Sequence, residues 1–219
     1  MRMNKVILQS IFVIILFFIK PVCLLHAQTV DEYYENLIKE EDFKKSADEK
    51  VKSGQYKNAH KDYEKAIEIN PSDVNAYIGR GNARYKLENY RAATRDYEKA
   101  LRLKPDDVNA LMARGAARYQ LGFYPAAKHD FSQVIEHNPE MAEAYVMRGH
   151  TCCFLNDYQS AEKDYTKAIE LKPGQAKVYF NRAKARLKLG DKAGAVADYR
   201  QAAALGLKIA QDWLSKNGY

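Results

Sequence analysis

Apolar and polar positions between residues 40 and 209 recur every 34 residues. Proline marks the period, at Pro71, Pro105, Pro139 and Pro173. Counting from these prolines divides the segment into five units: 40–73, 74–107, 108–141, 142–175 and 176–209. Inside each unit the apolar residues are spaced by three and four, which is typical of helices that bury one face. Each unit is therefore predicted to hold two helices of about 14 residues, for example over 74–87 and 90–103.

Certain positions of the unit carry the same kind of residue in each copy. A large residue opens the unit, as Phe43, Tyr77, Leu111, Tyr145 and Tyr179. Four residues later a small one follows, as Ala47, Gly81, Gly115, Gly149 and Ala183. The second helix carries alanine at Ala59, Ala93, Ala127, Ala161 and Ala195, and an aromatic residue at Tyr63, Tyr97, Phe131, Tyr165 and Tyr199. Small residues allow helices to approach closely, and the aromatic rings are expected to fill the wedge between units, which accounts for much of the high tyrosine count.

The combination Tyr77-x3-Gly81-x11-Ala93-x3-Tyr97-x2-Ala100-x4-Pro105 resembles the signature of the tetratricopeptide repeat (TPR) family. The resemblance implies an all-α fold, a right-handed superhelix of five helix-turn-helix repeats. The last unit departs from the pattern, with Leu207 in place of proline and Lys192 where the others have tyrosine. Terminal repeats are commonly atypical because they cap the stack.

The two ends of the repeat region carry different signals. Leu205, Ile209, Trp213 and Leu214 are predicted to share one face of a capping helix over about 207–216, within a C-terminal segment 207–219. An anchor for a partner is the alternative role for Trp213. Segment 28–39, before the first unit, is acidic and contains tyrosines. It is expected to be a short leader, either frayed or an extra turn of the first helix.

Residues 1–27 have the pattern of a secretory signal peptide. A basic start is followed by an apolar run over 6–19 and by Ala27 before Gln28. The run is shorter than the roughly 20 residues that span a bilayer as a helix. We therefore expect cleavage before Gln28 and export, to the periplasm or cell envelope if the source is bacterial. An uncleaved anchor is the alternative, and a lipid on Cys23 is disfavoured because Val22 precedes it.

Charge narrows the range of partners. The formal net charge of +7 falls to +4 without the three basic residues of 1–27. Positive and negative residues are well mixed along the chain, and such a charge distribution is not typical of a nucleic-acid-binding protein. Contact with a membrane is expected only through an uncleaved signal.

Two charged residues also recur every 34 positions. The arginines are Arg80, Arg114, Arg148 and Arg182, and the aspartates are Asp62, Asp96, Asp130, Asp164 and Asp198. Recurrence in successive units indicates a structural ladder. Because the first unit has Ser46 in place of arginine yet keeps Asp62, each aspartate is predicted to pair with the arginine of the next unit: Asp62–Arg80, Asp96–Arg114, Asp130–Arg148 and Asp164–Arg182. The alternative is a solvated stripe of weak surface pairs.

The sequence contains no recognisable catalytic or metal-binding motif. Cys152 and Cys153 are adjacent on a predicted helix and so point about 100° apart, which prevents a disulfide between them. Cys152 is expected to be a small core thiol and Cys153 to face the surface. The histidines fall at unrelated positions of the unit, and no nucleophile elbow, Walker loop, dinucleotide fingerprint or HExxH occurs. We expect no enzymatic activity, no metal and no cofactor.

The best candidate for a site is the concave face, which the family resemblance places on the first helices. Carried over by position, the candidate partner groove comprises Ile78, Asn82, Tyr85, Met112, Tyr119, Val146, His150, Phe180 and Lys184. The family's carboxylate clamp is not met, because Asp48, Gly79 and Ala113 stand at its positions. An apolar groove suits protein or peptide partners that offer hydrophobic anchors. The alternative is that these residues only pack along the inner curve.

These observations predict an exported TPR scaffold that binds a protein partner through an apolar concave groove. Two other functions remain open at this stage. The chain could be the non-catalytic subunit of an envelope enzyme or secretion complex, or a periplasmic assembly chaperone.

Overall fold

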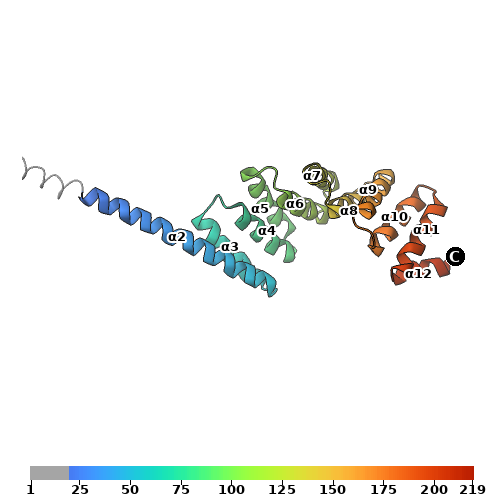
Figure 1. Ribbon diagram of the computed structural model, residues 1–219, viewed down its shortest axis with the longest axis horizontal. Helices are drawn as coiled ribbons and strands as arrows, with labels where there is room; N and C mark the ends of the chain where they lie inside the picture. Colours follow the sequence, from blue (N-terminus) through green and yellow to red (C-terminus); the bar gives the residue numbers. More distant parts are fainter. Residues whose placement is uncertain (1–19) are drawn as a thin grey trace, which may run out of the picture.

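The computed structural model describes residues 20–219, which form an array of helices (Figure 1). The predicted signal peptide, 1–27, lies outside the described residues except for its last eight positions. The helices are α2 (Lys20–Lys52), α3 (Tyr56–Ile69), α4 (Val74–Lys86), α5 (Tyr90–Leu103), α6 (Val108–Gln120), α7 (Tyr124–His137), α8 (Ala142–Phe154), α9 (Tyr158–Leu171), α10 (Ala176–Lys188), α11 (Lys192–Ala204) and α12 (Lys208–Lys216).

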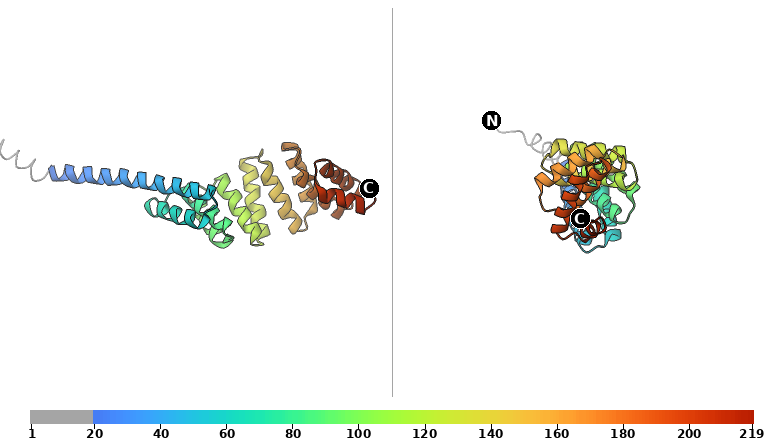
Figure 2. Two further views of the ribbon diagram at one scale, coloured as in Figure 1. Left: turned by 90° about the horizontal axis from the view of Figure 1, so that it is seen from below. Right: turned by 90° about the vertical axis from the view of Figure 1, so that its right-hand side faces the viewer.

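Consecutive helices pack in pairs, and the pairs stack into an elongated array (Figures 1 and 2). The predicted all-α solenoid of helix-turn-helix repeats with a C-terminal capping helix is confirmed. The first helices of successive units, α4, α6, α8 and α10, also contact one another. These helices therefore line the inner side of the curve.

The helix boundaries follow from local sequence. Asp73 and Asp107 cap α4 and α6 by accepting hydrogen bonds from backbone N–H groups of the first turn. Within units, three of the tight breaks are made by glycine with positive φ. Glu88 and Asn156 hold the corresponding positions in the second and fourth units, with φ of 60° and 59°. A glutamate is poorly suited to this conformation, so the second unit carries a local cost there.

Inside each unit an aromatic ring of the second helix lies against a small residue of the first. Tyr97 is 1% exposed, and a Cβ atom added to Gly81 would lie 2.5 Å from its ring. The same contact joins Gly115 to Phe131 and Gly149 to Tyr165, at 2.8 Å in both cases. In these three units even a Cβ atom at this position would press on the ring, whereas Ala47 and Ala183 occupy it in the first and fifth units. The recurring small residues are therefore explained by helix contact.

The segment before the first unit is helical and longer than predicted. α2 runs for 33 residues without a break, so 28–39 continues the first helix of the first unit by far more than one turn. Figure 2 shows this helix projecting from the end of the array. No helix in the described part of the chain is both long and apolar enough to cross a membrane.

α12 covers the last repeat. The ring of Trp213 stacks on Tyr199 with 4.0 Å between centroids, and Leu214 is buried. Two of the four residues predicted for this buried face are exposed, Leu205 at 39% and Ile209 at 56%. Leu205 ends α11 and is not part of α12, and the buried side of α12 is formed by Ala210 and Leu214, which are one turn apart.

The predicted pairing of the charge ladder is wrong. Arg114 donates two hydrogen bonds to Asp130 of its own unit, from Nη2 at 2.7 Å and from Nε at 3.1 Å. The same bidentate pairing joins Arg80 to Asp96, Arg148 to Asp164 and Arg182 to Asp198. Each pair links the first helix of a unit to the second, because antiparallel neighbours bring residues 16 apart side by side.

A second basic residue lies one turn after the ladder arginine on the first helix of most units. This residue explains why reasoning from the first unit gave the wrong pairing. Arg84, Arg118 and Arg186 donate to the aspartate of their own unit. In the first unit Lys50 takes this role and Ser46 donates from its hydroxyl, so Asp62 needs no arginine from the next unit. In the fourth unit the position belongs to Cys152, which is fully buried. Contacts between units run instead through pairs such as Arg118–Glu98 and Arg148–Ser132.

The wedge contact predicts a large loss of stability for Tyr97→Ala. Removing this buried ring should lower the free energy of unfolding by about 3–5 kcal/mol. Tyr97→Phe is the matched control, because it keeps the ring and removes only the hydroxyl that donates to Asn82 at 2.8 Å. That change should cost about 1 kcal/mol. Urea denaturation followed by circular dichroism measures both, and equal losses would contradict the wedge role.

A double-mutant cycle tests the pairing of the ladder. Arg114→Met and Asp130→Asn should show a coupling of about 1–3 kcal/mol, because Asp130 is fully buried between its partners. The matching cycle on Asp96 and Arg114 should give a coupling near zero. Strong coupling in the second cycle and none in the first would contradict the arrangement.

Candidate partner-binding site

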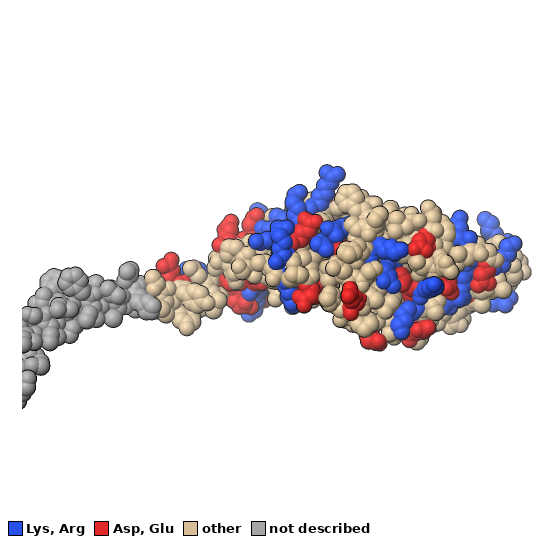
Figure 3. All heavy atoms as spheres, turned by 90° about the horizontal axis from the view of Figure 1, so that it is seen from above, with Lys and Arg blue, Asp and Glu red and all other residues tan. Residues whose placement is uncertain are grey.

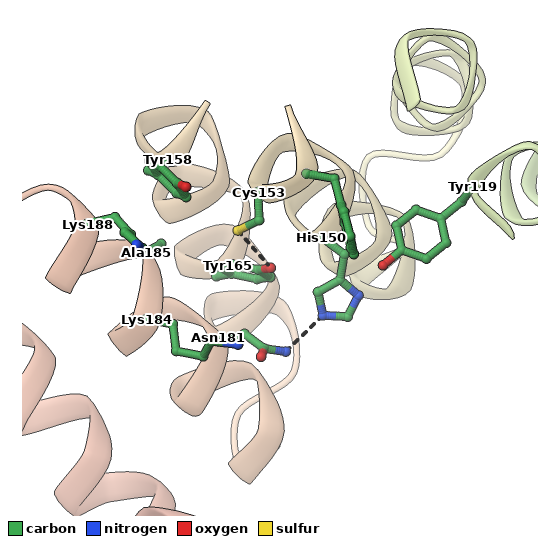
Figure 4. A pocket seen from close by; sticks show the side chains of 10 residues that line it. Tyr119, His150, Cys153, Tyr158, Tyr165, Asn181, Lys184, Ala185 and Lys188 are labelled. Carbon is green, nitrogen blue, oxygen red and sulfur yellow. Dashed lines mark hydrogen bonds between the residues drawn. The ribbon is translucent and has the colours of Figure 1, made fainter. Parts of the chain in front are cut away.

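A cavity of about 430 Å³ opens between the third, fourth and fifth units (Figure 4). We call it the inner hollow. Its walls come from the first helices α6, α8 and α10, and from α9 behind them. The lining residues are Tyr119, His150, Cys153, Phe154, Tyr158, Tyr165, Asn181, Lys184, Ala185 and Lys188. Its size is within the range of cavities that bind small molecules or peptide side chains.

Three of the nine predicted groove residues, Tyr119, His150 and Lys184, line the inner hollow. The other six lie elsewhere along the inner curve. Ile78, Met112 and Val146 are half-buried and pack against the core, and the Phe180 ring meets Tyr199 edge-on at 5.4 Å. These contacts give the four residues a part in packing, and their role in a groove stays a prediction.

The remaining two predicted residues have partners of their own. Asn82 accepts a hydrogen bond from the Tyr97 hydroxyl. The Tyr85 ring lies edge-on to Tyr90, with 5.1 Å between centroids. Tyr85 occupies the position of the unit that Tyr119 holds in the third repeat, but it does not line the inner hollow.

An aromatic cluster forms one side of the inner hollow. Tyr119 and Phe154 meet edge-on at 5.4 Å, and Phe154 stacks on Tyr124 at 4.7 Å. Phe154 is 56% exposed, so its ring offers an open apolar surface. The cluster joins the third unit to the fourth. Such exposed rings are frequent anchors in protein recognition.

Sequence reasoning missed Phe154 and Tyr158, for different reasons. Phe154 has no periodic signal, because Lys86, Gln120 and Lys188 hold its position in other units. Tyr158 belongs to a recurring set that could have been found. It opens the second helix of its unit, as Tyr56, Tyr90 and Tyr124 do.

The interior of the inner hollow is polar but uncharged. The Asn181 amide Nδ2 lies 2.8 Å from His150 Nε2, and Cys153 Sγ lies 3.6 Å from the Tyr165 hydroxyl (Figure 4). Burial, together with the nearby ammonium group of Lys184, lowers the pKa of His150. Burial raises the pKa of the Cys153 thiol and that of the Tyr165 hydroxyl. At neutral pH the ring, thiol and hydroxyl are therefore all uncharged.

Two lysines give the inner hollow its charge. Lys184 and Lys188 lie one turn apart on α10, and both are exposed. Neither has an ion-pair partner within residues 29–219, and the lining contains no acidic residue. Lys184 Nζ rests 5.9 Å from the centre of the Phe180 ring. The surface that a ligand meets is thus aromatic and positively charged. Among the described residues no cluster of His, Cys, Asp or Glu could hold a metal ion.

Comparison with protein families identifies the class of protein. A family model described as TPR repeat matches residues 47–88 and 81–122, and models described as tetratricopeptide repeat match 113–151, 142–175 and 176–205. Together these matches span well over half of the chain. The chain belongs to the tetratricopeptide repeat family.

Several solved structures superpose on this chain. A crystal structure of MamA protein superposes with a TM-score of 0.72 at 22% identity, covering 79% of this chain and 94% of that one. MamA 41-end from Desulfovibrio magneticus RS-1 superposes with a TM-score of 0.73 at 20% identity, covering 80% of this chain and 97% of that one. YrrB, described as a TPR protein with an unusual peptide-binding site, superposes with a TM-score of 0.67 at 22% identity, covering 75% of this chain and 84% of that one. At these identities the likeness supports the fold alone. No curated protein matches the chain.

The lowered pKa of His150 predicts a loss of stability in mild acid. A histidine in the unfolded chain has a pKa of about 6.5, so the unfolded chain takes up this proton at a higher pH than the folded chain. Stability should therefore fall as the pH drops from 7.5 to 5.5, and it should not change through this group above that range. His150→Gln should lose less stability over this interval than the unaltered chain. His129→Gln, whose side chain is exposed, is the control and should behave like the unaltered chain in urea denaturation at both pH values.

Proposed function

We propose that this TPR protein is a non-catalytic scaffold that recognises a protein partner through the inner hollow. One observation carries the proposal. Lys184 and Lys188 lie at the edge of an open aromatic cavity and have no ion-pair partner within residues 29–219, whereas Arg148 and Arg182 on the same inner helices are held in the ladder. Two neighbouring lysines without an acidic partner do not stabilise the fold through ion pairs. They suit a ligand that supplies the missing acidic and apolar groups.

The partner segment should combine an aromatic or large aliphatic anchor with acidic residues. The anchor would lie against Tyr119 and Phe154, and the acidic groups would meet the two lysines. Helical or extended segments present side chains at spacings that can serve both. The description of YrrB as having a peptide-binding site supports peptide recognition within this fold, but it speaks for that protein alone.

The chemistry of the inner hollow supports binding without catalysis. The Cys153 thiol is held in its protonated form by burial, so it is a weak nucleophile. His150 is neutral and pairs with an amide, not with a carboxylate that could orient it as a general base. A scaffold needs neither.

The proposal includes export from the cytoplasm. The apolar run over 6–19 and the Ala27–Gln28 junction support a cleaved secretory signal. Sequencing the N-terminus of the mature protein tests this point. A chain that begins at Gln28 supports export with cleavage, and a chain that retains Met1 in the membrane fraction contradicts it.

An affinity pull-down from native envelopes, followed by calorimetry on the captured partner, tests the binding site. Tyr119→Ala with Phe154→Ala, or Lys184→Glu with Lys188→Glu, should weaken binding about 10–100-fold, since hot-spot residues contribute about 2 kcal/mol or more. Tyr85→Ala is the control for the rings, because it holds the equivalent position outside the inner hollow. Lys208→Glu with Lys216→Glu on α12 is the control for charge. Full-strength binding by both test variants would place the partner on another surface.

A further inference from the structure

The projecting part of α2 carries an exposed apolar face, which we call the α2 face. It consists of Val30, Tyr33, Tyr34, Leu37 and Ile38, and each is between 39% and 63% exposed. Their spacing of three and four places them on one side of the helix. Leu37 and Ile38 border Val74 and Asn75 of α4 across a cavity of about 590 Å³, yet all five side chains remain largely open to solvent. Five large apolar residues on one exposed side of a helix are rarely left in water without a partner.

Charge is distributed unevenly between the two ends of the chain. Segment 28–41, which carries the α2 face, holds five acidic residues and a single lysine. The last repeat and the tail, 176–219, hold nine basic residues and three acidic ones. In Figure 3 the described part of the projecting helix is mainly tan and red. The molecule therefore has an acidic, apolar end and a basic end.

The α2 face has the chemistry that the inner hollow requires. It offers two exposed tyrosine rings and three aliphatic side chains on one helical side. Asp31 and Glu41 flank it. Glu41 is 73% exposed, and it shares the Lys44 ammonium group with Glu40 and Asp73. The inner hollow offers open rings and two unpaired lysines. Helices that dock in grooves use anchors at this spacing of three, four and seven.

We propose that the α2 face of one molecule docks into the inner hollow of a second copy of this chain. The inference rests on the proposed function of the inner hollow as a binding site and names its occupant. Docking within one molecule is prevented, because α2 projects from the end of the array opposite to the fifth unit (Figure 1). Pairing of two α2 faces would bring two acidic segments together, which like charges oppose.

The proposed contact joins different surfaces of the two molecules. Each molecule keeps one free α2 face and one free inner hollow after docking. Such head-to-tail contacts generate rings or open chains and do not stop at a dimer unless the ring closes there. Assembly should therefore grow with protein concentration, and it should weaken with salt because the contact is between opposite charges.

Sedimentation velocity on the chain that begins at Gln28, the mature form under the proposed function, tests the inference by charge reversal. In one variant the inner hollow is made acidic by Lys184→Glu with Lys188→Glu, and in the other the helix is made basic by Asp31→Lys with Glu41→Lys. Each variant alone should stay monomeric at concentrations where the unaltered chain assembles. Mixed in equal amounts, the two variants should assemble again, since each reversed surface then meets its complement. This form lacks the apolar run over 6–19, so association through that run cannot be mistaken for docking of the α2 face.

The outcomes separate this inference from the proposed function. Monomeric unaltered chain at all concentrations, or assembly by either variant alone, overturns the inference. Assembly that is lost in Tyr34→Ser with Ile38→Ser but kept in Lys184→Glu with Lys188→Glu shows that α2 faces pair with each other, and it also overturns the inference. In these cases the proposed function still stands if the lysine variant loses the partner captured by pull-down. The proposed function fails if that variant keeps the captured partner at full strength.

Discussion

The close contact between an aromatic ring and a glycine or alanine determines how the two helices of each unit are placed. The ring of the second helix fits only because the first helix has no side chain beyond Cβ at the crossing point, as at Gly81 and Gly149. This contact sets the distance between the helices. The same distance brings Arg114 within reach of Asp130, and it leaves the inner surface of the first helices free to form a cavity. The ion pairs and the inner hollow thus depend on how closely the helices pack.

The charged residues near the inner curve serve two purposes. Those buried between the helices of a unit are fully paired, as Asp130 is by Arg114 and Arg118. A buried carboxylate without such partners would be strongly destabilising. Those on the open side of α10 have no partner within the described chain, and they act on what approaches from outside. Burial therefore separates charges that hold the fold from charges that can recognise a ligand.

Most of the fold could be predicted from the sequence, because the period of 34 residues repeats the same packing contact five times. The ladder shows where this reasoning fails. In the sequence, Asp130 lies at a similar distance from Arg114 of its own unit and from Arg148 of the next unit. The packing of the helices determines which of the two arginines it pairs with. The inner hollow was harder to predict because it depends on residues that break the period. Phe154 and Lys188 occupy the same position in the fourth and fifth units. One contributes an aromatic ring to the inner hollow and the other a positive charge.

The cysteine at position 152 has a consequence for how the array comes apart. In repeat proteins, stability is close to a sum of terms within units and between neighbours. The fourth unit has Cys152 in place of the second basic residue, so Arg148 is the one arginine of the described chain that pairs with Asp164. A cavity of about 280 Å³ borders the Cys152 thiol. Lys128 of the third unit compensates in part by reaching Asp157 at 2.9 Å, but it secures the loop and not the helix pair. The ion pairing between the two helices of the fourth unit thus depends on a single arginine, and this unit stands in the middle of the inner hollow. Force or heat that parts the array there would divide the binding surface before either half lost its own helices.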